Sequence, residues 1–341
     1  MNDYGHKDNQ NTCHREGYDI LAEIKKRLHL RIRTEMARTR FFYHLLALAV
    51  VAVWGVTFVC TKVLIQAGLQ PAEIFAIRFL LAYVGIWIVS MGKAQTRRLW
   101  SRNWKDELIF VFLGITGGSF YFLTENTALA YTQATNAAFL VSSTPVLTAL
   151  LTLLVKRFGK SRFVEGLEKI RLSPTFILGT LLALTGMALV VFDGSHFEFS
   201  LRGDLLAIGA ALCWATYSLF MGQMTEEYGP MLATRKVFFY GLLTIIPFLL
   251  GQDGFDPALL LQPKVGLNLL FLGLVASLAC FVVWNLVMAR LGNVTCTNYV
   301  YLNPVFTLIT AMIFLGERMT PLAAIGSAAI LLGVILAGRR N

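Results

Sequence analysis

The chain has 341 residues, of which 56% are hydrophobic and 15% are charged, and its mean hydropathy is +0.62. A soluble domain carries roughly 25% charged residues, so this composition excludes an ordinary soluble protein. The formal net charge of +10 lies mostly in the N-terminal segment and a few loops, a distribution that argues against a nucleic-acid partner.

The apolar residues are grouped in blocks of the length needed to cross a lipid bilayer as a helix. Backbone polar groups in lipid must be paired internally, which makes helices the default, and the alternating pattern of a membrane barrel is absent. We therefore predict an all-α polytopic membrane protein that lies in a lipid bilayer.

Residues 1–41 form a polar, basic N-terminal segment that we expect to be cytoplasmic. Ile20, Leu21, Ile24 and Leu28 recur at helical spacing, so part of it is a candidate amphipathic helix on the membrane surface. The alternatives are a disordered tail or an extension upstream of a start at Met36. A full-length span follows the basic run, which is not the pattern of a cleavable signal peptide.

Ten spans are predicted, in two sets of five. The first set lies at 42–63, 72–91, 108–128, 133–155 and 175–193, and the second at 204–224, 232–250, 267–290, 295–315 and 322–338. The corresponding domains are a first five-helix repeat, 42–193, and a second, 194–341.

The two sets share a repeated pattern. Phe122, Asn126 and Pro145 recur 159 residues later as Phe281, Asn285 and Pro304 (281 − 122 = 285 − 126 = 304 − 145 = 159). An odd number of spans in each half makes the second half enter the membrane from the opposite side. The pattern thus predicts two inverted five-helix repeats, an arrangement that secondary transporters use for alternating access.

Lysine and arginine predict the orientation of the chain. They gather in the N-terminal segment, in the loops after spans two and four, and at Arg339 and Arg340, all on one side if the spans alternate. The Asp193–Asp204 and Gly251–Lys264 loops fall on the other side. The exception to this charge distribution is the loop after span six, where the acidic residues Glu226 and Glu227 lie on the basic side. By the positive-inside rule both termini are expected to be cytoplasmic.

The sequence resembles a known family over residues 42–338. The similar segments are Ala49–Phe58, Pro71–Phe79, Asn136–Pro145 and Leu302–Glu317. In this order they resemble the drug/metabolite transporter superfamily, in its EamA-like branch. The first half departs from the pattern at Val155-Lys156-Arg157, where a Leu-Gly-Glu ending is expected. The resemblance implies a ten-helix inner-membrane carrier with a central cavity, which moves small metabolites without a bound cofactor.

Polar side chains inside predicted spans are the candidate site, because each is costly in lipid unless it lines water or finds a partner. Glu125 could bind a substrate ammonium group or carry a coupling proton, or it could only end its helix at the interface. Asn126 and Asn285 occupy equivalent positions and are interpreted as interhelical hydrogen-bonding groups or as cavity residues.

Two proline regions are further cavity candidates. Asn136 and Ser142 precede Pro145, and Tyr299 and Asn303 precede Pro304. A proline frees a backbone carbonyl, and opened backbone at membrane depth is tolerated where it lines a cavity. A packing kink at each proline is the alternative.

Two tryptophans complete the candidate site. Trp54 with Thr57, and Trp214 with Tyr217, each place an aromatic ring and a hydroxyl on one helical face, where they would either line the cavity or pack in the core. Glu73 and Arg78 are expected to sit at the interface or to pair with other charges, although the resemblance makes Arg78 worth testing.

Enzyme chemistry has little support in the sequence. We find no Walker-type phosphate loop, no Gly-x-Ser-x-Gly motif and no metal-ligand spacing among the five cysteines, so no catalytic residue, metal or cofactor is predicted.

The expected function is a secondary carrier in the plasma membrane that exports amino acids or related small molecules by alternating access with proton exchange. The alternatives are an importer or exchanger of nucleotide derivatives, and a membrane scaffold or sensor that transports nothing. A second copy of the chain, in a homodimer, is the possible protein partner.

Overall fold

The structure is a computed structural model that describes residues 39–91, 99–158, 173–192, 200–251, 256–315 and 320–338. The candidate surface helix, most of the basic loop residues, and Arg339 and Arg340 lie outside these ranges. The chain divides into two units, Met1–Leu45 and Leu46–Asn341. Of the first unit only residues 39–45 are described, and they begin the first span. Apart from the start of that span, the helices and contacts described below lie in the second unit.

The described ranges contain helices and no strands. In chain order they are Thr39–Gln66, α2 (Pro71–Ser90), α3 (Trp104–Gly114), η2 (Ile115–Ser119), α4 (Phe120–Tyr131), α5 (Ala134–Val141), α6 (Thr144–Phe158), α8 (Pro174–Phe192), α9 (Leu201–Tyr228), α10 (Pro230–Leu250), α11 (Ala258–Leu261), α12 (Pro263–Leu270), η3 (Phe271–Ala279), α13 (Cys280–Leu291), α14 (Asn293–Thr297), η4 (Asn298–Leu302), α15 (Asn303–Leu315) and α16 (Pro321–Gly338).

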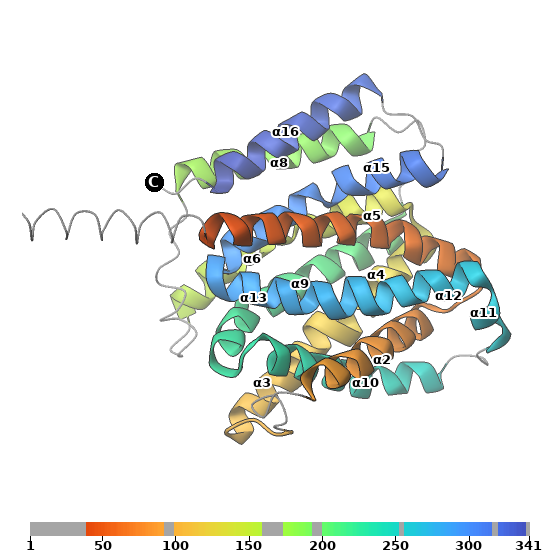
Figure 1. Ribbon diagram of the computed structural model, residues 1–341. Coiled ribbons are helices and arrows are strands. Elements are labelled where there is room, and N and C mark those ends of the chain that lie inside the picture. Colours follow the sequence, from red (N-terminus) through yellow and green to blue (C-terminus); the bar gives the residue numbers. More distant parts are fainter. Residues whose placement is uncertain are drawn as a thin grey trace, which may run out of the picture. The chain divides into compact units, whose positions relative to one another are not determined.

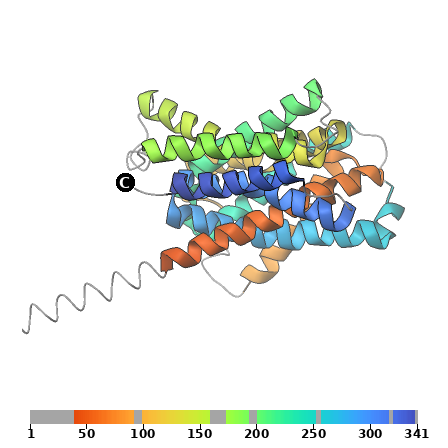
Figure 2. The same cartoon turned by 90° about the horizontal axis from the view of Figure 1, so that it is seen from above.

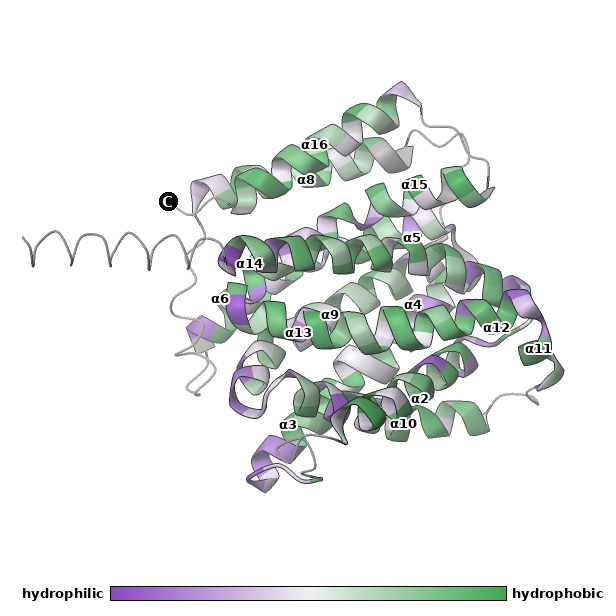
Figure 3. Cartoon of the chain, viewed as in Figure 1, coloured by the Kyte–Doolittle hydropathy of each residue, from purple (hydrophilic) through white to green (hydrophobic). Residues whose placement is uncertain are grey.

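Apolar residues dominate these helices, as Figure 3 shows by colour. Among the described residues, seven continuous helical segments are long and apolar enough to cross a membrane, the first being Thr39–Gln66 and the last Pro263–Leu291. Pro174–Leu189 and Ala324–Ala337 are shorter apolar helices. The chain is therefore a multi-pass helical membrane protein. The ten predicted spans fall largely on helical backbone, while ten crossings and an inverted arrangement stay predictions.

α2 and α10 both begin with a proline, at positions that are 159 residues apart. α2 begins at Pro71, and the side chain of Glu73 accepts a hydrogen bond from the Gln70 amide at 2.8 Å in a capping box. α10 begins at Pro230 after Gly229, whose φ of 79° is unfavourable for other residues. Proline fits the first helical position because the amide it lacks would be unpaired there.

π-helical segments interrupt the two equivalent long spans at the same place. η2 covers Ile115–Ser119, and adding 159 to these numbers gives 274 and 278, inside η3 at Phe271–Ala279. Gly118 in η2 has φ −126° and ψ −106°, outside the helical region. Such π-helical turns are uncommon and are often found at functional sites.

A close contact between two helices is found at equivalent positions in the two halves of the chain. A Cβ added at Gly114 would lie 2.9 Å from the Gly241 amide and against Tyr240, and one added at Gly273 would lie 2.7 Å from the Leu81 Cβ. Tyr240 is 159 residues after Leu81, so the two contacts are related by the shift of the repeat. The third span of each half thus packs on the second span of the other half.

α8 and α16 lie side by side and form the most extensive helix pair in the described residues (Figures 1 and 2). Each helix contributes two glycines to this contact. A Cβ at Gly186 would be 2.6 Å from the Gly326 carbonyl oxygen, and one at Gly333 would be 2.6 Å from the Gly179 carbonyl oxygen. Small residues let helix backbones approach closely in lipid, where apolar side chains gain little from burial.

Candidate functional site

A small cavity lies where the first span, α2, α4, α5, α9, α13, η4 and α15 meet. Its lining residues are Trp54, Thr57, Phe58, Arg78, Tyr121, Phe122, Glu125, Val141, Trp214, Phe281, Val300 and Asn303. The cavity volume is about 20 Å³, which is room for about one water molecule. Both halves of the chain contribute to its wall.

The wall contains breaks in two spans at equivalent positions. α5 ends at Val141 and η4 ends at Leu302, and the next helices begin at Thr144 and Asn303, which are 159 residues apart. Val141 and Val300 both line the cavity. Pro145 and Pro304 are the second residues of α6 and α15, and a kink at each proline stays a prediction.

Aromatic rings form most of the remaining wall. The ring centroids of Trp54 and Trp214 lie 5.2 Å apart in an edge-to-face arrangement, and those of Phe122 and Phe281 lie 6.2 Å apart. Trp54 Nε1 donates to the Ala276 carbonyl oxygen at 3.0 Å, which attaches this ring to the π-helical segment η3. A movement of η3 would therefore shift a wall of the cavity.

Opposite charges face the cavity from α2 and α4. Arg78 is 1% exposed, its Nε donates to Ser277 Oγ at 2.9 Å, and its guanidinium carbon lies 4.3 Å from the centre of the Phe122 ring. Glu125 is 6% exposed, and its Oε1 accepts from the Tyr121 hydroxyl at 2.9 Å. Arg78 and Glu125 form no direct ion pair, so both keep capacity to bind a ligand.

Asn303 adds an amide to this wall. It is 4% exposed, and its Oδ1 is buried without a hydrogen-bond partner. Ten buried side-chain atoms of the described residues have no hydrogen-bond partner, and the Asn303 oxygen is the one among them that belongs to a residue lining the cavity. It is available to a donor group on a ligand.

The structure brings together five of the side chains that the sequence identified: Trp54, Thr57, Glu125, Trp214 and Asn303. It adds Arg78, which was expected at the interface or paired with another charge. Arg78 lies in the second turn of α2, is 1% exposed, and contacts Ser277 and Phe122. The side chain of Glu73 caps the N-terminus of α2 by accepting the hydrogen bond from the Gln70 amide.

Asn126, Asn285 and Tyr217 lie outside the lining of the cavity and make interhelical hydrogen bonds. Asn126 Nδ2 donates to the Pro71 carbonyl oxygen at 3.0 Å. Asn285 Oδ1 accepts from the Tyr217 hydroxyl at 2.6 Å, and its Nδ2 donates to Thr234 Oγ1 at 2.8 Å. These contacts are of the bridging kind proposed for the asparagines.

Asn136, Ser142 and Tyr299 also lie outside the lining. Asn136 Nδ2 donates to Thr132 Oγ1 at 2.8 Å and to Asp204 Oδ1 at 2.9 Å, which ties α5 to the start of α9. Ser142 Oγ donates to the carbonyl oxygen of Val300 at 3.0 Å, so it joins the two broken spans. Tyr299 lies in η4, next to Val300 of the wall.

Sequence reasoning missed several lining residues, above all Tyr121, Phe122 and Phe281. Phe122 and Phe281 are related by the shift of 159, so their conservation between the two halves was an available signal. No comparable signal marked Tyr121. Within the described part of the chain, no group of three His, Cys, Asp or Glu side chains lies close enough to hold a metal ion.

Together, the helices and this cavity define a class: a multi-pass membrane protein with a polar, aromatic-walled cavity between two related halves. The EamA-like transporter family matches the chain twice, over residues 41–192 and 201–339. The chain belongs to this family of transporters.

Relatives with curated names agree with that assignment. A protein of Archaeoglobus fulgidus named an uncharacterized transporter is 29% identical over 296 residues, covering 86% of this chain and 96% of its own length. A probable amino-acid metabolite efflux pump of Salmonella typhimurium is 28% identical, covering 85% and 93%. A probable terminal-alkyne amino-acid exporter of Streptantibioticus cattleyicolor is 27% identical, covering 85% and 91%.

A solved crystal structure also shares the fold. It matches with a TM-score of 0.66 at 18% sequence identity, and the match covers 87% of this chain and 97% of that one. At this identity the likeness concerns the fold alone.

Proposed function

We propose that this protein is a secondary active transporter that exports amino acids or closely related zwitterions across the plasma membrane by alternating access. In this proposal ten spans form two inverted five-helix repeats, 42–193 and 194–341, and both termini are cytoplasmic. The twofold match of the family, the paired π-helical segments and the paired glycine contacts support the inverted repeat.

The observation that carries the substrate class is the pair of opposite charges at one cavity. Arg78 can hold a carboxylate, and Glu125 can hold an ammonium group. Charge-assisted hydrogen bonds of this kind are roughly twice as strong as neutral ones. A zwitterion satisfies both charges at once and leaves the cavity neutral, which an anionic nucleotide derivative would not do.

The aromatic wall suits the ammonium end of the same substrate. Trp214 lies beside the Tyr121 ring, with centroids 4.9 Å apart, and Tyr121 donates to Glu125. Aromatic faces attract cations, and the attraction is stronger where water is excluded. The names of two relatives, an amino-acid metabolite efflux pump and an amino-acid exporter, point in the same direction.

The small volume of the cavity supports a mechanism in which access alternates. A space of about 20 Å³ holds one water and no amino acid, so substrate entry requires the wall to move. The broken spans and η3, which holds Trp54, are the elements we propose to move. Glu125 is the proposed carrier of the coupling proton, because it is a carboxylate placed at the cavity within a membrane span.

The test compares cells that express the chain with cells that express Glu125→Gln or the control Glu226→Gln, at equal protein level. Glu226 is exposed and far along α9 from the cavity, at the opposite end from its start. Untargeted mass spectrometry then follows solutes in cytosol and medium. We expect the wild type and Glu226→Gln to move zwitterionic solutes outward and Glu125→Gln to move them about tenfold more slowly, as expected for a lost hydrogen bond to a charged group.

Other outcomes would change the proposal. Equal export by Glu125→Gln and the wild type would retain transport but remove Glu125 from the mechanism. A phenotype that needs residues 1–40 and survives Glu125→Gln and Trp54→Ala, with no solute moved, would favour the scaffold instead.

A further inference from the structure

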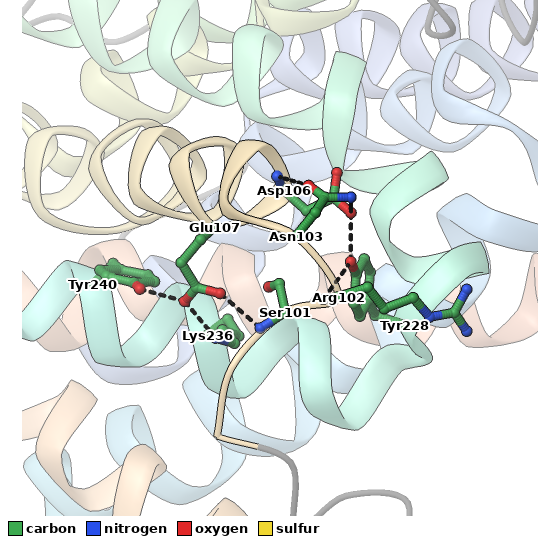
Figure 4. Close-up of polar contacts among 8 residues, drawn as sticks. All are labelled: Ser101, Arg102, Asn103, Asp106, Glu107, Tyr228, Lys236 and Tyr240. Carbon is green, nitrogen blue, oxygen red and sulfur yellow. Dashed lines mark hydrogen bonds and ion pairs between the residues drawn. The ribbon is translucent and has the colours of Figure 1, made fainter.

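The start of α3 is joined to the second half of the chain by a cluster of polar side chains (Figure 4). Glu107 accepts hydrogen bonds from Lys236 and Tyr240 of α10, and its other oxygen accepts from the Ser101 amide at 2.7 Å. The carboxylate thus binds α10 at two positions that are one helical turn apart.

The neighbouring carboxylate binds another helix of the second half. Asp106 accepts a hydrogen bond from the hydroxyl of Tyr228, the last residue of α9. Asn103, the N-cap of α3, donates to the same Asp106 oxygen at 2.9 Å, and the Arg102 amide donates to the Tyr228 hydroxyl at 3.1 Å. The two carboxylates and their partners in α9 and α10 form what we call the Glu107 cluster: Asp106, Glu107, Tyr228, Lys236 and Tyr240.

The repeat places an equivalent contact, between α12 and α2, at the opposite end of the bundle (Figure 1). The N-caps of α3 and α12, Asn103 and Gln262, are 159 residues apart, which fixes the correspondence. The residues equivalent to the Glu107 cluster are all uncharged: Val265, Gly266, Leu69, Ile77 and Leu81. The two equivalent contacts therefore differ in chemistry, because one contains an ion pair and the other contains apolar residues.

The same difference continues along these helices toward the cavity. The hydroxyl oxygens of Ser119 and Thr244 lie 2.7 Å apart. At the equivalent place in the other contact, a Cβ added at Gly85 would lie 2.6 Å from Leu278 Cδ2 (278 − 119 = 244 − 85 = 159). The contact of α3 and η2 with α10 is thus polar over its length, and its counterpart is apolar.

Both equivalent contacts are closed in the structure. Leu113, six residues after Glu107, and its counterpart Leu272 are fully buried. At the end of the bundle where α9 begins, a hydrogen bond between Asn136 and Asp204 also joins α5 to α9. The central cavity of about 20 Å³ is therefore shut off from both ends, and one end must open for a substrate to pass.

We infer that the Glu107 cluster is the gate at the end of the bundle that the proposed topology places in the cytoplasm. Its hydrogen bonds hold that end closed and break when the end opens. The inference rests on the proposed alternating access, in which one half of the chain moves against the other. It assigns to one step of that cycle a set of residues that lie outside the substrate cavity.

The burial of the ion pair makes its effect on opening large. The side chains of Lys236 and Glu107 are 5% and 16% exposed, so salt and water screen their attraction less than on an open surface. If Glu107 loses its charge, Lys236 stays buried without an anion, and opening of the gate lets water reach it. The closed state is then weakened at this end, whereas the apolar contact between α12 and α2 is unchanged.

The test measures how fast single buried cysteines react with a small water-soluble thiol reagent, in the purified full-length protein without substrate. The cysteines are Leu113→Cys near the gate and Leu272→Cys at the equivalent place, in a chain whose five native cysteines are replaced. Each is combined with Glu107→Gln, Tyr240→Phe or the control Glu226→Gln. Glu226 is exposed in the last turn of α9 and lies outside the Glu107 cluster.

We expect Glu107→Gln to speed the labelling of Leu113→Cys about tenfold, because the closed state loses hydrogen bonds to a charged group. Tyr240→Phe keeps the ring and removes only the hydroxyl that binds Glu107, so the increase should be smaller. Labelling of Leu272→Cys should be no faster in any variant, and Glu226→Gln should match the parent chain at both positions.

Two results would overturn the inference. The first is equal labelling of Leu113→Cys in Glu107→Gln, Tyr240→Phe and the parent chain. The second is an equal increase at Leu113→Cys and Leu272→Cys, which would indicate loosened packing of the whole bundle. Failure of the proposed substrate is distinguishable from both, because it would appear as absent amino-acid transport, whereas the labelling rates are measured without substrate.

Discussion

Buried polar residues at the centre of this protein fall into two groups, according to whether their hydrogen bonds are complete. Asn285 is fully buried between Tyr217 and Thr234 and bonds to both, so it ties α13 to α9 and α10. Asn303 is also buried but has an unpaired oxygen at the cavity wall. The first arrangement stabilises helix packing, and the second keeps a polar atom available to a ligand.

This distinction predicts a non-additive effect on stability. Asn285→Leu leaves the hydroxyl of Tyr217 buried without a partner, which we expect to cost about 1 to 2 kcal/mol of unfolding free energy. Adding Tyr217→Phe removes that hydroxyl, so the double variant should be more stable than the sum of the two single losses predicts. Reversible unfolding in detergent measures all four proteins, and strictly additive losses would contradict the bonded arrangement.

The sequence led to part of this picture because the repeat aligned Asn126 with Asn285. It did not place Arg78 at the cavity. The hydroxyl of Ser277 and the ring of Phe122, which receive the Arg78 side chain, lie 199 and 44 residues away in the sequence. Tertiary contacts of this range carry no local signature.

At the scale of elements, the two π-helical segments are the feature that links packing to the site. η3 holds Trp54 through the Ala276 carbonyl and places Ser277 beside Arg78. Gly114 and Gly273 let the adjoining helices approach α10 and α2 at their equivalent positions. The prolines drew attention to the regions before Pro145 and Pro304, whereas the π-helical turns depend on hydrogen-bond registers that composition does not reveal.

The close approach at Gly114 predicts a sensitive position. In Gly114→Ala the new methyl group meets the backbone of α10, so we expect a loss of about 1 to 3 kcal/mol of unfolding free energy, as for other overpacked sites. The matched control is Gly209→Ala in α9, where a Cβ would meet nothing within 4 Å. That variant should be unchanged or slightly more stable, because alanine favours helix by roughly 1 kcal/mol. Equal effects of both changes on thermal unfolding would contradict the contact.

At the scale of the whole molecule, the repeat relates the two walls of the cavity, but the charges come from one half only. Arg78 and Glu125 correspond to Val237 and Trp284 in the second half. The proposed scaffold is therefore symmetric while its substrate contacts are not. Length and hydropathy predicted the helical spans well, but the cavity itself could not be predicted, because it depends on how eight separate elements meet.

The inverted arrangement predicts where loops face. Single cysteines introduced at Arg102 and Arg157 are expected to react only with a thiol reagent that reaches the cytoplasm. A cysteine at Asp256 should react with an impermeant reagent added outside the cell. The background is a chain whose five native cysteines are replaced by serine or alanine. Labelling of Arg102→Cys and Asp256→Cys from the same side would contradict the topology.

The central claim is that one occluded site recognises both charges of a zwitterion. The most direct measurement is counterflow in liposomes that contain the purified protein, with a labelled neutral amino acid, its decarboxylated amine and its N-acetylated form. We predict uptake of the amino acid alone, and uptake about tenfold slower for Arg78→Gln and Glu125→Gln, since each change removes a hydrogen bond to a charged group. Equal uptake of the three compounds, or wild-type rates in both variants, would contradict the claim.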